Sequence, residues 1–149
     1  MVRACGMLCF NLYNTEVTMI EIRYTPPNEI SIVGTVQELQ AVQAGILHIA
    51  TMSGSTLPYR VTARTAGSPA PYTHWLAELI VALSAGAIKV SVIDTSSLMI
   101  SGAADKLDVF ASFWSFAPDA LPHTHTHHEY FEGNSCIEPD SLPVVIEVK

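Results

Sequence analysis

The chain has 149 residues, 49% of them hydrophobic and 14% charged, which predicts one compact globular domain over residues 1–149 and excludes a largely disordered chain. Its 7 basic and 14 acidic side chains give a formal net charge of −7. An acidic surface repels phosphates, so we expect no nucleic-acid partner, whereas a basic protein partner would suit it.

Neither a signal peptide nor a membrane span is predicted. The first residues carry one positive side chain, Arg3, and a short apolar run that Asn11 interrupts. Residues 75–93 form the most apolar stretch, but Glu78 and Lys89 break it. We therefore expect this stretch in the core of the domain.

The three cysteines are Cys5, Cys9 and Cys136, an odd number without the Cys-x-x-Cys spacing of zinc sites. Reduced, mostly buried thiols are expected from such a set, as in a protein of the cytoplasm. We accordingly predict a cytoplasmic location.

The chain begins with a predicted hairpin. Residues 17–24 alternate between the two faces and are rich in β-branched side chains, which is typical of a strand. The Pro-Pro turn at residues 25–28 reverses the chain, and residues 29–33 return as the second strand.

A helix is predicted after the hairpin. Thr35 and Glu38 have the spacing of a capping box, in which each side chain satisfies a free backbone N–H of the other residue. Apolar residues then recur at helical spacing until Ser53-Gly-Ser55 ends the helix near residue 52. They are Val36, Leu39, Val42, Ile46 and Ile49.

Residues 59–65 alternate again and predict a strand, and residues 66–71 predict a loop. The stretch at residues 75–83 is ambiguous, because its apolar spacing fits a helix while a buried strand has the same composition. Both alternatives stay open for this stretch.

The second half of the chain predicts a similar series of elements. They are strands at residues 87–94 and 98–101, a helix at residues 103–116, and strands at residues 123–131 and 143–148.

The two halves match at an offset of 68 residues. Residues 20–24 align with residues 88–92, and residues 30–34 align with residues 98–102, with Gly at the end of both. This offset predicts an internal repeat over residues 17–83 and 85–149.

Each half would then contain strand, strand, helix, strand and strand. Such a ββαββ duplication predicts an α+β fold, a two-layer sandwich with two helices on one face of a mainly antiparallel sheet. We expect the two halves to join edge to edge as a single eight-stranded sheet.

Histidines gather on one predicted strand. Alternate residues of a strand share a face, so His123, His125 and His127 would lie together with Glu129, and His128 would lie opposite. Two imidazoles about 6.5–7 Å apart along a strand can chelate Zn²⁺, with a further ligand from a neighbouring strand. Zinc is therefore the one cofactor that the sequence suggests, and a solvated histidine face is the alternative.

No catalytic residue is predicted. The sequence contains no Gly-x-Gly-x-x-Gly, phosphate-binding loop or Gly-x-Ser-x-Gly motif, and no acid–base pair stands out. An enzyme is therefore not the leading interpretation.

Residues 125–134, His-Thr-His-His-Glu-Tyr-Phe-Glu-Gly-Asn, are followed at residues 139–147 by Pro-Asp-Ser-Leu-Pro-Val-Val-Ile-Glu. This stretch resembles the C-terminal signature of small bacterial immunity proteins of polymorphic toxin systems, in which a Ser-Leu-Pro closing strand follows a His-rich strand. The similarity covers roughly the last 60 residues, with His125, His127 and Ser141 at the recurrent positions of that family. Residues 59–65 of the first half carry no histidines and depart from the pattern.

This resemblance implies a cytoplasmic, non-enzymatic protein that neutralises a cognate toxin domain by occluding its active surface. The negative charge would complement a basic toxin. The alternatives are a metal-binding protein that uses the histidine strand and a homodimeric structural domain whose sheet edges pair between chains.

Overall fold

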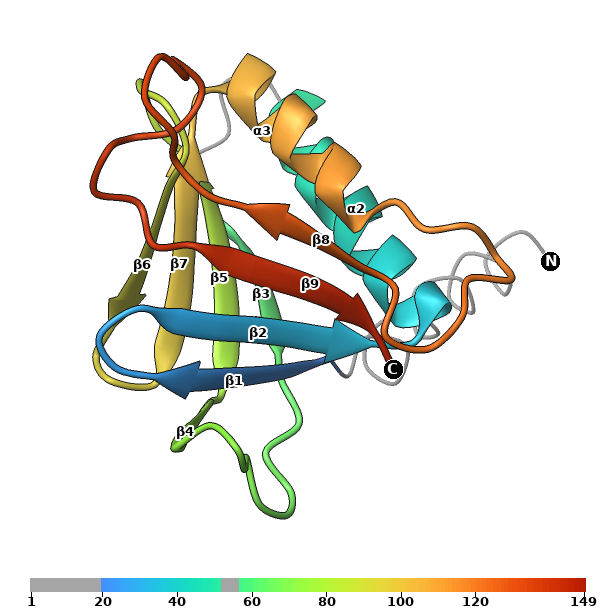
Figure 1. The fold of residues 1–149 in the computed structure, drawn as a ribbon. Coiled ribbons are helices and arrows are strands. Elements are labelled where there is room, and N and C mark those ends of the chain that lie inside the picture. Colours follow the sequence, from blue (N-terminus) through green and yellow to red (C-terminus); the bar gives the residue numbers. More distant parts are fainter. Residues whose placement is uncertain (1–19, 52–56) are drawn as a thin grey trace, which may run out of the picture.

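The computed structural model describes residues 20–51 and 57–149, which form two helices, one short 3-10 helix and nine strands in two sheets (Figure 1). The predicted α+β class is confirmed. Cys5, Cys9 and the first part of the predicted strand at residues 17–24 lie outside the described residues.

The front sheet in Figure 1 has five strands in the order β4-β1-β2-β9-β8. All neighbouring strands are antiparallel except β2 and β9, which are parallel. The strands are β1 (Glu21–Thr25), β2 (Glu29–Gly34), β4 (His74–Leu76), β8 (His125–His128) and β9 (Val144–Val148).

The second sheet lies behind the first, and its strands run across those of the front sheet (Figure 1). Its order is β3-β5-β7-β6, with β5 and β7 parallel. The strands are β3 (Tyr59–Thr62), β5 (Glu78–Leu83), β6 (Lys89–Ile93) and β7 (Ser97–Gly102).

The stretch that fitted both helix and strand is therefore extended. It forms β4 and β5, separated by Ala77. The backbone N–H of Ala77 donates to Ser96 O at 2.7 Å, and its carbonyl accepts from Ala63 N at 2.8 Å. These two hydrogen bonds satisfy the backbone where the chain passes from one sheet to the other.

The helices are α2 (Val36–Thr51) and α3 (Ala104–Ala111), and α3 continues as the 3-10 helix η1 (Ser112–Trp114). The predicted capping box is present, since Thr35 N–H donates to Glu38 Oε1 at 2.9 Å and Glu38 N–H donates to Thr35 Oγ1 at 3.1 Å. Neither helix of the described residues is long and apolar enough to cross a membrane.

The helices pack side by side, and α2 also contacts strands of both sheets (Figure 1). One continuous apolar core results, in which the two helices and both sheets take part. Its most deeply buried helical side chains, each at most 1% exposed, are Leu39, Val42, Ile46, Leu107, Phe110, Ala111 and Trp114.

The expectation of a single eight-stranded sheet is wrong, because the strands form two sheets. The hairpin β1–β2 of the first half joins the strand pair β8–β9 of the second half in one sheet. In the other sheet, the pair β3–β5 of the first half joins the hairpin β6–β7 of the second half. Parallel pairing at β2–β9 and at β5–β7 makes each junction. The two halves therefore share both sheets, instead of each covering its own sheet with its own helix.

The element bounds follow the offset of 68 residues. Glu21–Thr25 corresponds to Lys89–Ile93, and Glu29–Gly34 corresponds to Ser97–Gly102. The helices that follow begin at equivalent positions, Val36 and Ala104.

The two matched glycines have matched environments. A Cβ on Gly34 would lie 3.2 Å from Ile20 Cγ2, and a Cβ on Gly102 would lie 2.6 Å from Cδ1 of Ile88, which is the equivalent isoleucine. Close approach of an isoleucine therefore explains why both hairpins end in glycine before the helix.

Candidate binding site on the five-stranded sheet

The histidine strand of the structure is shorter than predicted, because β8 covers only His125–His128. His125 and His127 do share the outer face of the sheet, as the alternation predicted, and both are exposed. Their ring centroids lie 4.9 Å apart in an edge-to-face arrangement.

His123 lies before the strand and not in it. Its φ of 74° is in the left-handed region, so the alternation of a strand does not extend to this residue. The ring Nδ1 lies 2.7 Å from Glu147 Oε2, and the backbone N–H donates to Val148 O. This histidine is engaged with β9.

His128 points into the core, where only 2% of it is exposed. Its ring packs edge-to-face against the rings of Phe110 and Phe113, at centroid distances of 4.7 and 4.9 Å. Burial lowers the pKa of His128 to about 4, so the side chain is neutral near pH 7. The structure assigns His128 a packing role.

The five predicted metal ligands are thus not brought together. His128 is inside, His123 is engaged with Glu147, and Glu129 follows the end of the strand. Within residues 20–51 and 57–149, no group of three or more His, Cys, Asp or Glu side chains has the arrangement of a metal site. Zinc binding stays a prediction from the sequence.

Ser141 of the closing motif has a structural contact. It is buried, and its Oγ accepts a hydrogen bond from the backbone N–H of Val90 at 2.8 Å. Leu142 N–H donates to Val90 O at 2.9 Å. Together these bonds attach the chain before β9 to the edge strand β6 of the other sheet.

We expect the Ser141→Ala variant to lose about 1–2 kcal/mol of unfolding free energy, because it leaves the Val90 N–H buried without an acceptor. Urea denaturation would measure the loss. Ser115→Ala, which removes an exposed hydroxyl, is the control and should stay within about 0.5 kcal/mol of the parent. Equal stability of the two variants would contradict this role.

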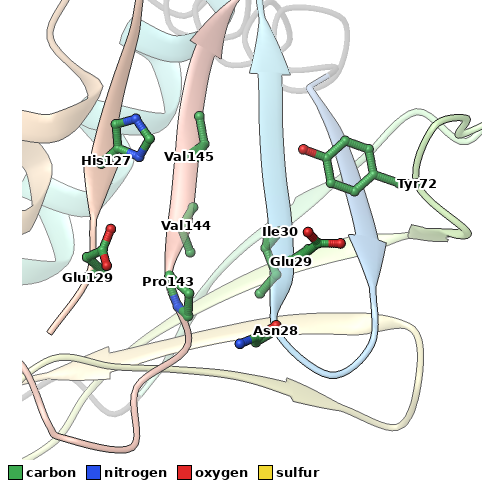
Figure 2. Close-up of a pocket in the computed structure, with 9 residues that line it drawn as sticks. All are labelled: Asn28, Glu29, Ile30, Tyr72, His127, Glu129, Pro143, Val144 and Val145. Atoms are coloured by element: carbon green, nitrogen blue, oxygen red, sulfur yellow. The ribbon is translucent and has the colours of Figure 1, made fainter.

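A hollow of about 260 Å³ opens on the outer face of the five-stranded sheet, where β2 and β9 begin and β8 ends. Figure 2 shows His127 and Glu129 on one side of it, Glu29 and Tyr72 on the other, and Val145 between them. The complete lining is Asn28, Glu29, Ile30, Tyr72, His127, Glu129, Pro143, Val144 and Val145.

The carboxylates of this hollow differ from Glu21, another acidic group on the same face. Glu21, which is largely buried, has three basic neighbours, at 2.9 Å in Arg23, 3.6 Å in Arg64 and 3.8 Å in Lys149. Glu29 and Glu129 are exposed and have no ion pair with any residue of the described chain. Their negative charge is available to a ligand.

The equivalent place on the four-stranded sheet has a different chemistry. Ser97 stands there in the position of Glu29, and Thr62 in the position of Glu129. Arg60, which pairs with Ile80 as His127 pairs with Val145, forms an ion pair with Glu78 at 3.2 Å. Among the described residues, the positions of the four-stranded sheet that are equivalent to Glu29 and Glu129 thus carry no acidic side chain.

Sequence reasoning singled out His127 and Glu129 but missed Glu29 and Tyr72. The hollow joins the first hairpin, the loop before β4 and the second half of the chain, and parallel pairing of β2 with β9 creates that junction. The sequence predicts the turn at residues 25–28 and places Glu29 at the start of the next strand, but it does not indicate which part of the chain they face.

Comparisons with protein-family models, with curated proteins and with solved structures found no match to this chain.

Proposed function

We propose that this chain is a non-enzymatic binding protein that holds a basic segment of a partner protein on the outer face of its five-stranded sheet. The observation that carries the proposal is the difference between the two equivalent faces in the described part of the chain. The hollow has exposed carboxylates without ion pairs, Glu29 and Glu129, where the four-stranded sheet has Ser97 and Thr62. Charge complementarity at such a site speeds association and selects the partner.

In its specific form, the proposal is that of an immunity protein in the cytoplasm, which neutralises a toxin domain by covering its active surface. The similarity of residues 125–147 to such proteins supports it, as does the net charge of −7. His127 and Glu129 of that similar stretch line the hollow. A toxin that acts on nucleic acid has the basic surface that an acidic inhibitor complements.

The test is to express each protein that is encoded beside this gene and to measure its binding to the purified chain and its effect on bacterial growth. One of the neighbours is expected to bind and to arrest growth unless this chain is co-produced. Absence of both effects for all neighbours would overturn the immunity assignment.

The Glu29→Gln, Glu129→Gln double variant is expected to bind that partner about 10-fold to 100-fold more weakly, since two charge-assisted contacts are lost. Asp108→Asn, Asp119→Asn is the matched control, because it removes two exposed charges without ion pairs from outside the hollow. Calorimetry would measure the affinity of both double variants for the partner. Equal weakening by the two would mean that only the net charge matters, and it would contradict the assignment of binding to this face.

A further inference from the structure

We propose that the group held in the hollow is a single arginine side chain, a step that rests on the proposed function and names the recognised chemistry. The hollow measures about 260 Å³ and lies on the outer face of the sheet, so one long side chain can enter it from a partner surface. The remaining lining residues decide which long cationic side chain fits better.

The carboxylates lie on opposite sides of the hollow, Glu129 beside His127 and Glu29 on the side of Tyr72 (Figure 2). A guanidinium is planar and presents five N–H donors that diverge, so it can reach acceptors on two sides at once. An ammonium concentrates its charge at one point and would have to favour one carboxylate. The arrangement therefore favours arginine over lysine.

Tyr72 supplies an aromatic ring on the side of Glu29, and Val145 supplies apolar surface between the two sides (Figure 2). A guanidinium lies well against an aromatic ring, and the methylene groups of the arginine stem gain from contact with apolar side chains.

The same sheet face already holds one guanidinium by this combination of groups. Arg23 of β1 lies over the Trp75 ring, with Cζ 5.8 Å from the ring centroid, and its Nη2 donates to Glu21 Oε1 at 2.9 Å. An aromatic ring and a carboxylate thus contact one guanidinium on this surface. The hollow offers the ring of Tyr72 and two carboxylates in equivalent roles.

The experiment titrates the protein with N-acetyl-arginine-methylamide and with the matching lysine compound at equal ionic strength, followed by amide chemical shifts. We expect saturable shifts near Glu29, Tyr72, Glu129 and Val145, with the arginine compound binding at least about 5-fold more tightly than the lysine compound. Tyr72→Leu and the Glu29→Gln, Glu129→Gln double variant should abolish the saturable shifts. His125→Ala, on the same strand but outside the lining, should retain them.

Equal affinity for the two compounds, or shifts centred on other residues, would overturn the arginine assignment. Such a failure leaves the proposed function separately testable, since the neighbouring-gene partner could still bind through this face by other groups. Conversely, selective arginine binding together with no neighbouring partner would overturn the immunity assignment alone.

Discussion

Lowering the pH from 7.5 to 4.5 is expected to cost the folded protein about 2–3 kcal/mol through His128 alone. Histidine in the unfolded chain takes up a proton near pH 6.5, whereas burial lowers the pKa of folded His128 to about 4. Between these values only the unfolded chain binds the proton, so acid favours unfolding. The loss of unfolding free energy begins as the pH falls below about 6.5 and is complete below pH 4.

Urea denaturation of the parent and of His128→Leu at several pH values would measure this effect. Leucine removes the titrating group from between Phe110 and Phe113, so the variant should gain about 2–3 kcal/mol relative to the parent on going from pH 7.5 to pH 4.5. His127→Leu is the control, because His127 is exposed on the other face of the same strand. Parallel pH profiles for the parent and His128→Leu would rule out the buried neutral histidine.

Replacing Gly45 by alanine is expected to destabilise the parent by about 1–3 kcal/mol, although alanine is the better helix former. A Cβ at Gly45 would overlap the ring of Tyr59, which packs against the core from β3. The ring is partly buried, and this burial raises the pKa of Tyr59 to about 12. Moving this ring away from the helix would expose apolar surface.

The same substitution should change sign in a Tyr59→Thr background. Without the ring, Gly45→Ala only improves helix propensity and should stabilise the protein by up to about 1 kcal/mol. A double-mutant cycle from urea denaturation would measure the coupling, which we expect at about 2–3 kcal/mol. Additive effects of the two substitutions would contradict the contact.

The second half shows why this pair is coupled. Phe113 stands at the helical position equivalent to Gly45, and Thr126, whose hydroxyl donates to Phe113 O at 2.7 Å, stands at the strand position equivalent to Tyr59. The large side chain thus comes from the strand in one half and from the helix in the other.

Local patterns predicted the hairpins and the capping box, because each depends on residues close together in the chain. The offset between the halves was found by comparing two such local patterns. The alternation that placed His125 and His127 together is of the same kind. It failed at His123, which has a left-handed backbone and lies before the start of the strand. A histidine in the sequence does not indicate such a conformation.

Partition of the strands into two sheets could not be predicted in this way. A hairpin of either half presents the same apolar alternation to both possible neighbours, so the choice between β2–β9 and an edge-to-edge join depends on long-range packing. The hollow depends on that choice, since Glu29 and Glu129 come from hairpins of different halves. Its carboxylates could be seen in the sequence, but their proximity could not.

The exchange of hairpins has a consequence for the order of folding during synthesis. When the ribosome has released β1, β2, α2, β3 and β5, the partner strands of β2 and β5 have not yet been synthesised. These partners are β9 and β7. Nascent chains stalled before β7 should therefore remain protease-sensitive throughout, and protection of the earliest hairpin should appear only once β9 has emerged.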